Sequence, residues 1–182
     1  MKIYLWVILV VGWIGSASAN NIPVSNAITI SEKGVGPING KTPFSQKEVQ
    51  KLLPKLEVAQ VSSMTEGEEF PILEVSDKKG LLFTINPDSN AKLIYSIVVG
   101  KDRVTNSLGH RTGQSYKEVY GGFPAECVAG EEERSGTVFC LAPKSRHIGY
   151  QFASKKGDSL DGEVPQLKML NTWIIKSVFW QP

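Results

Sequence analysis

The sequence predicts an α+β fold, in which a unit of one helix and four strands occurs twice and forms an antiparallel sheet with the helices packed on one face. Three observations predict it: a short internal repeat, a helix-start signal in each copy, and extended segments separated by turn residues after each helix. Neighbouring strands joined by short turns pair as antiparallel hairpins. We expect a single domain over residues 20–182, with similar halves over about 27–103 and 104–182.

The first residues are typical of an export signal. Lys2 precedes an apolar stretch over residues 3–14, and Ala17-Ser18-Ala19 fits a signal-peptidase site. The apolar stretch is shorter than the roughly 20 residues that a spanning helix needs. We expect cleavage after Ala19 and a periplasmic or secreted mature form that does not span the membrane; a retained anchor is the alternative.

The charges are nearly balanced. The chain has 20 basic and 18 acidic residues, and loss of Lys2 with the signal leaves 19 and 18, a net charge of +1. This balance gives no electrostatic support for binding nucleic acid. We therefore expect no nucleic-acid partner.

The internal repeat lies at an offset of 70 residues and covers thirteen positions, of which six are identical. The identical pairs are Thr42 and Thr112, Ser45 and Ser115, Lys47 and Lys117, Glu48 and Glu118, Val49 and Val119, and Pro54 and Pro124. The match suggests a duplication, and a chance match is the alternative for so short a segment.

Each copy carries the signal of a helix start. Ser45 and Ser115 are each followed three residues later by a glutamate, which is the pattern of a capping box. The first helix then has an apolar stripe at i, i+3, i+4 and i+7 from Val49 to Leu56. The second helix should be shorter, because Gly121-Gly122 provides a left-handed stop.

The strands are expected between turn-forming residues. In the first half they are residues 57–62, 70–76, 81–86 and 93–100, and in the second half 126–129, 137–142, 147–153 and 172–180. A further short strand over residues 27–31 is expected at an edge of the sheet.

Cys127 and Cys140 are the only cysteines, and they flank the turn-rich segment 130–136. If this segment closes a hairpin, the two side chains face each other on adjacent strands. Together with the export signal, this placement predicts a disulfide. Free thiols are the alternative, and no histidine lies at a spacing that suits a metal site.

No catalytic or cofactor motif is present. Neither His110 nor His147 lies near a serine or cysteine in a nucleophile motif, and both are expected at a turn or a strand end. Ser76 and Lys79 match Ser-x-x-Lys, but they lie on a predicted hairpin turn rather than at a helix start. We expect a protein that is not an enzyme and that has no catalytic residue, cofactor or metal site.

Two regions are candidates for contact with a partner. The longest connection, residues 154–171, contains Asp158, Leu160 and Asp161, and long loops in compact domains are often functional. Strict alternation also places Trp180 on the opposite sheet face from Trp173 and Phe179, which predicts exposed aromatic surface at Trp180.

Several segments along the mature chain resemble the RpoE-regulated lipoprotein family of Gram-negative bacteria, a domain of unknown function. They are residues 30–36 (Ile-Ser-Glu-Lys-Gly-Val-Gly), 42–44 (Thr-Pro-Phe), the pair Cys127 and Cys140, 147–152 (His-Ile-Gly-Tyr-Gln-Phe) and 173–180 (Trp-Ile-Ile-Lys-Ser-Val-Phe-Trp). The resemblance implies an envelope protein of the stress-response class without assigned catalytic residues. This chain departs from the family's lipoproteins, because Asn20 stands where they carry a lipid-accepting cysteine.

The helix-plus-four-strand plan also looks like that of β-lactamase inhibitor proteins, in which a sheet presents a binding surface. Three functional hypotheses follow. The first is a non-enzymatic periplasmic binding or accessory module that engages another envelope protein and is linked to envelope stress. The second is an inhibitor of a secreted or periplasmic hydrolase, with an exposed concave aromatic surface. The third is a hydrolase in which His110 or His147 approaches a carboxylate or a serine.

Overall fold

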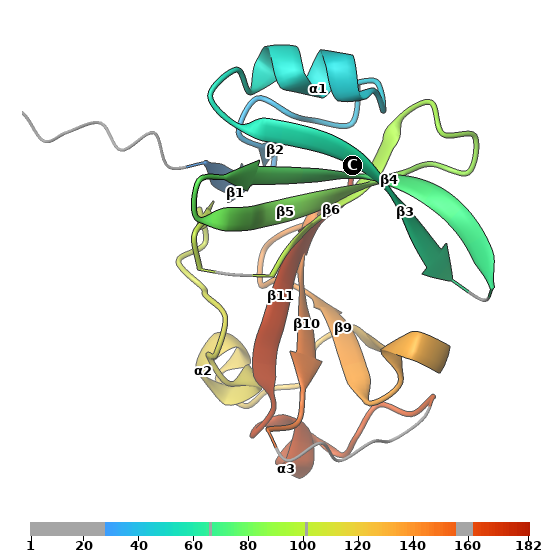
Figure 1. Ribbon diagram of the computed structural model, residues 1–182. Helices are drawn as coiled ribbons and strands as arrows, with labels where there is room; N and C mark the ends of the chain where they lie inside the picture. The colour runs from blue at the N-terminus through green and yellow to red at the C-terminus, as the bar shows by residue number, and fades with distance from the viewer. Residues whose placement is uncertain (1–27, 66, 101, 156–161) are drawn as a thin grey trace, which may run out of the picture.

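The computed structural model describes residues 28–65, 67–100, 102–155 and 162–182, and within these ranges an antiparallel sheet of eight strands forms the main layer. Its strands are β3 (Glu57–Thr65), β4 (Glu68–Asp77), β5 (Gly80–Pro87), β6 (Ile94–Val99), β8 (Cys127–Ala129), β9 (Thr137–Leu141), β10 (Ile148–Ala153) and β11 (Ile174–Trp180). They are ordered β3-β4-β5-β6-β11-β10-β9-β8. Figure 1 shows that the sheet is strongly twisted, so its two ends turn toward the same side.

The sheet consists of two hairpin-connected runs, β3 to β6 and β8 to β11, which meet where β6 pairs with β11. The eight strands predicted from the sequence are confirmed, with ends that differ by at most three residues. This agreement follows from the turn residues between the strands, which limit where each strand can begin and end. The α+β class is therefore confirmed, with far more strand than helix.

The expected edge strand near residue 30 belongs to a separate small sheet instead. Strand β1 (Thr29–Ser31) pairs antiparallel with β2 (Gly34–Val35) and parallel with β7 (Thr105–Asn106). The amide of Thr105 donates to the carbonyl of Ile28, and the amide of Ser107 donates to the carbonyl of Ile30. The prediction that this strand joins the main sheet is therefore wrong, because its partners are the two short strands β2 and β7.

The helices are short: α1 (Gln46–Leu52), α2 (Tyr116–Tyr120), α3 (Leu167–Leu170) and the 3-10 turn η1 (Glu132–Arg134). The capping box is complete at Ser115, whose side chain accepts from the amide of Glu118 while the carboxylate of Glu118 accepts from the amide of Ser115. The side chain of Ser45 makes no capping bond. The capping box is thus confirmed for the second helix and wrong for the first.

Helix α1 packs against the edge strand β3. Val49 is fully buried and Leu53 is nearly so, but Leu52 faces solvent, so only part of the predicted apolar stripe is buried. The side chains of Gln46 and Gln50 bind the outer edge of β3: Gln46 donates to the carbonyl of Val58 at 2.8 Å, and the carbonyl oxygen of Gln50 accepts from the Val58 amide at 3.1 Å. The helix therefore hydrogen-bonds the first part of an edge that would otherwise be open.

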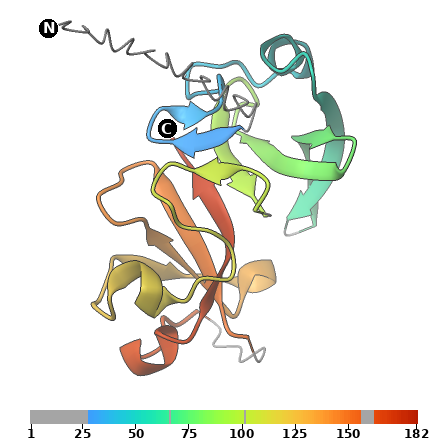
Figure 2. The same cartoon turned by 90° about the vertical axis from the view of Figure 1, so that its left-hand side faces the viewer.

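Helix α2 lies at the opposite end of the molecule, beside β10 and β11 (Figure 2). Tyr116 is fully buried, stacks on Tyr120 and meets the ring of Phe152 edge-on at 5.3 Å. Helices α1 and α2 and the small sheet thus help to enclose one continuous core.

Among the helices of the described ranges, none combines the length and the apolar character that a membrane span requires.

Candidate functional site

A β-bulge in β11 decides which of its aromatic side chains reach the surface. Gln151 pairs with Ser177 and the next residue, Phe152, pairs with Ile175, which leaves Lys176 as the extra residue. A bulge of this kind shifts the alternation of side chains by one position. Trp173 and Trp180 therefore both lie in the core, at 0% and 2% exposure.

The prediction of exposed aromatic surface at Trp180 is accordingly wrong. Its indole N–H points to the carbonyl of Glu32 at 3.4 Å, and its ring lies beside that of His147. The neighbouring Phe179 lies on the opposite face, where it is half-buried and lines a groove.

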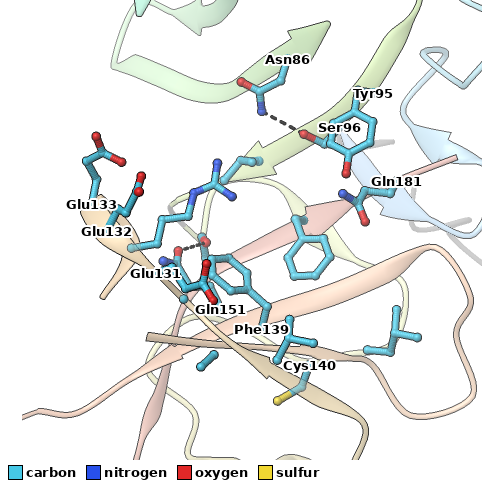
Figure 3. Close-up of a pocket in the computed structure, with 18 of the residues that line it drawn as sticks. Asn86, Tyr95, Ser96, Glu131, Glu132, Glu133, Phe139, Cys140, Gln151 and Gln181 are labelled. Atoms are coloured by element: carbon cyan, nitrogen blue, oxygen red, sulfur yellow. Dashed lines mark hydrogen bonds between the residues drawn. The ribbon is translucent and has the colours of Figure 1, made fainter. Parts of the chain in front are cut away.

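The groove is an open concavity of about 990 Å³ on the sheet face opposite the core (Figure 3). Its lining comes from both ends of the sheet, because Phe70 of β4 and the turn η1 between β8 and β9 contribute to the same concavity. The main lining side chains of the central strands are Asn86, Ser96, Val98, Phe139, Leu141, Gln151, Ser177 and Phe179. The twist of the sheet therefore builds a concave surface that the described residues leave open.

Apolar side chains cover much of the groove. The rings of Phe139 and Phe179 lie 6.0 Å apart, and the exposed side chains of Val128 and Tyr95 add to the same surface. Tyr95 is the extra residue of a bulge in β6, since Asn86 pairs with Ser96 and the next residue pairs with Ile94. This bulge re-aims Tyr95, as bulges next to functional sites often do.

Gly149 allows the ring of Phe179 to lie across the strand beside it. The two residues are directly paired in β10 and β11, and a Cβ at Gly149 would lie 2.1 Å from Cζ of Phe179. An aromatic ring that covers a glycine on the neighbouring strand is a known device for stabilising sheets. The groove surface at Phe179 thus depends on the missing side chain at residue 149.

Replacement of Gly149 by alanine should displace the Phe179 ring and lower the free energy of unfolding by about 1–3 kcal/mol, because the new methyl group overpacks the site. Urea unfolding of the variant measures the loss. The double variant Gly149→Ala with Phe179→Ala is the control, since removal of the ring should recover most of the cost of the methyl group. Equal losses with and without the ring would contradict the steric explanation.

Polar groups in the groove are paired with one another. The hydroxyl of Ser177 donates to the side-chain oxygen of Gln151 at 2.8 Å, and the amide of Asn86 donates to the hydroxyl of Ser96 at 2.9 Å. The guanidinium carbon of Arg134 lies 5.7 Å from the ring centre of Phe139, within the range of a cation–π contact. The side-chain amides and hydroxyls can form further hydrogen bonds to a molecule in the groove, since both kinds of group donate and accept.

The disulfide predicted from the sequence is confirmed. Cys127 of β8 and Cys140 of β9 are directly paired, and their sulfurs lie 2.08 Å apart. The bridge ties β8, the short outermost strand, to the rest of the sheet. It thereby anchors the hairpin that carries Val128 and the turn η1 at the groove.

A family model described as a protein of unknown function, DUF1131, matches residues 12–182 of the chain. The chain belongs to the DUF1131 family. Among solved structures it is similar to the crystal structure of the uncharacterized protein yfeY from Escherichia coli, with a TM-score of 0.66 and 22% sequence identity over 86% of this chain and 99% of that chain. At this identity the likeness shows the fold alone. No curated protein matches the chain.

The two histidines of this DUF1131 chain lie in different surroundings. Nδ1 of His110 lies 2.7 Å from the hydroxyl oxygen of Tyr150, and the side-chain amide of Asn106 donates to the same oxygen at 3.2 Å. Burial lowers the pKa of His110 and raises the pKa of Tyr150 to about 12. Nδ1 of His147 donates to the carbonyl of Gln181 at 2.8 Å.

Three of the predicted contact residues, Asp158, Leu160 and Asp161, lie outside the described residues. Within the described ranges, no group of three or more His, Cys, Asp or Glu side chains is arranged to hold a metal ion. Sequence reasoning missed the groove residues Phe139 and Phe179. The alternating pattern placed them on strands, but the register between strands and the bulge at Lys176 were needed to bring them to one face.

Proposed function

We propose that this DUF1131 protein is a non-enzymatic binding module of the cell envelope, which holds another envelope protein against the groove of its sheet. The observation that carries the proposal is the open concavity of about 990 Å³ with Phe139 and Phe179 in its lining. Exposed apolar surface rimmed by polar groups is typical of interaction sites. Most other large side chains of the sheet are used in the core.

An oxidising compartment fits this proposal. The disulfide between Cys127 and Cys140 is typical of exported proteins, and the expected signal at residues 1–19 would deliver the chain to the periplasm. The link to envelope stress rests on the resemblance to the RpoE-regulated lipoproteins and belongs to the same proposal.

We also propose that the two hairpin runs arose by duplication, since each follows a helix that begins with the shared Ser-x-Lys-Glu-Val segment.

Inhibition of a secreted or periplasmic hydrolase is the second candidate. The observation that favours it is the concave aromatic surface itself, because a rigid sheet that presents aromatic side chains can cover the active-site opening of an enzyme. An inhibitor would form a tight one-to-one complex and abolish the activity of its target. An accessory module would bind its partner without that loss of activity.

The test places a photo-cross-linking amino acid in the full chain and activates it in intact cells. Val128 and Tyr95 are suitable positions, because both are more than half exposed and line the groove. Leu52 on α1 is the matched control, an exposed apolar residue away from the groove. We expect mass spectrometry to identify the same envelope protein at both groove positions and not at Leu52. Recovery of no envelope protein at Val128 and Tyr95 would contradict the proposal.

A further inference from the structure

The net charge of the groove lining is opposite in sign to the net charge of the whole chain. Among the described residues, the charged side chains of the groove are Glu126, Glu131, Glu132, Glu133 and Arg134. They carry four negative charges and one positive charge, a local balance of −3, whereas the chain as a whole has a net charge of +2. No lysine of the described ranges lines the groove, although the chain is rich in lysine.

The backbone holds three of these carboxylates in one short turn. The amide of Gly130 donates to the carbonyl of Thr137, and the amide of Arg134 donates to the carbonyl of Glu131. A Cβ at Gly130 would lie 2.2 Å from the carbonyl oxygen of Arg134, so the turn requires glycine at this position. The disulfide at the base of the same hairpin adds to its rigidity. Figure 3 shows the three carboxylates at one side of the groove.

Arg134, the positively charged residue that the described part of the chain contributes to the groove, lies close to the aromatic lining. Arg134 is near the ring of Phe139, and this contact shows that a cation is accommodated on that surface. A second cation over Phe179 or near Glu131 would meet the same two kinds of partner, a ring face and carboxylates. A phosphate-bearing partner would meet net repulsion instead.

The uncharged groups of the groove suit an extended polypeptide. Gln151, Ser177, Asn86 and Ser96 present amide and hydroxyl groups across neighbouring strands. Side chains of an extended segment alternate between two sides, so one set can contact the rings while the other reaches the acidic turn. A volume of about 990 Å³ is at the upper end of the range for small-molecule sites, and the open shape leaves room for a chain to enter and leave.

We propose that the occupant of the groove is an extended basic segment of a protein, in which lysine or arginine alternates with apolar or aromatic residues. This inference rests on the proposed binding function and names the chemistry of the partner. The carboxylates of Glu126 and Glu131 attract its basic side chains, and Phe139 and Phe179 contact its apolar ones. Because the carboxylates are exposed, they contribute to the rate and specificity of binding more than to its total strength.

Three synthetic peptides of equal length test the inference in calorimetric titrations with the oxidised mature protein. One alternates lysine with leucine, one alternates glutamate with leucine, and one alternates lysine with serine. We expect the lysine–leucine peptide to bind most tightly and to lose affinity as salt is added. The glutamate–leucine peptide should not bind. Equal affinity for the lysine–leucine and glutamate–leucine peptides would overturn the inference.

Charge reversal in the groove provides the matched variants. The double variant Glu126→Lys with Glu131→Lys should weaken binding of the lysine–leucine peptide roughly tenfold, since two attractive contacts become repulsive. Glu57→Lys reverses an exposed glutamate at the start of β3, outside the groove lining, and should leave the affinity unchanged. Matching thermal unfolding curves would verify that the variants are folded. An unchanged affinity in the double variant would overturn the inference.

The cellular cross-link separates this inference from the proposed function. With the photo-cross-linker at Val128, we expect the double reversal to reduce capture of the partner and Glu57→Lys to leave it intact. Undiminished capture in the double variant would overturn the basic-segment inference while the binding function stands. Absence of capture in the unmodified chain would contradict the binding function itself.

Discussion

Replacement of Trp180 by alanine should lower the free energy of unfolding by about 3–5 kcal/mol, the usual cost of removing a fully buried tryptophan. The residue is 2% exposed, and it lies in the central strand β11 between Ile97 of β6 and Ile148 of β10. The missing ring would leave a cavity at the junction of the two hairpin runs. Chemical denaturation followed by circular dichroism measures the loss.

Phe179→Ala is the matched control, because it removes the adjacent aromatic ring from the opposite face of the same strand. Phe179 is only half-buried, so we expect a loss of about 1–2 kcal/mol. A Trp180→Ala variant as stable as Phe179→Ala would show that Trp180 lies at the surface. That outcome would contradict the assignment of the bulge at Lys176.

Removal of the disulfide by Cys127→Ser with Cys140→Ser should cost about 3 kcal/mol, because a bridge between residues 13 positions apart restricts the unfolded chain. Urea unfolding of the oxidised protein and of the double variant measures the difference. The intact mass of protein purified from the periplasm provides an independent check, since the bridged form lacks two hydrogen atoms of the reduced form.

The single variant Cys140→Ser adds a sharper comparison. It removes the bridge and leaves a free thiol at Cys127, so its free energy of unfolding should be close to that of the double variant. A mass equal to that of the reduced form, or unfolding curves that coincide for oxidised protein and double variant, would contradict a bridge in the mature protein. Loss of the bridge should also weaken binding at the groove, because β8 and the acidic turn are anchored through it.

Local signals in the sequence predicted much of this fold. The strands lie where turn residues leave room for them, the capping box at Ser115 forms as its spacing indicates, and Cys127 and Cys140 pair across the hairpin that separates them. Each of these features depends on residues close together in the chain. The prediction of a capping box at α1 is wrong, because Ser45 has the required sequence neighbours but its side chain makes no capping bond.

The groove depends on information that is not local. Whether Trp180 or Phe179 faces the core is decided by one extra residue at Lys176, and nothing in the strand's own composition marks that position. The concavity itself arises because Phe70 and the turn at Glu131 approach each other across a twisted sheet. Neither the twist nor the register between β6 and β11 can be obtained from the alternation of side chains alone.

The hydrogen bonds from Gln46 and Gln50 to Val58 have a consequence for solubility. A sheet that does not close on itself presents its outermost strands as templates for fibril growth. Here one outermost strand, β8, has only three residues, and the first part of the other has its backbone groups occupied by amide side chains. Because α1 occupies these backbone groups, less of the β3 edge is open to pairing with a second chain, and we expect chain-to-chain stacking along β3 to be slower at high concentration.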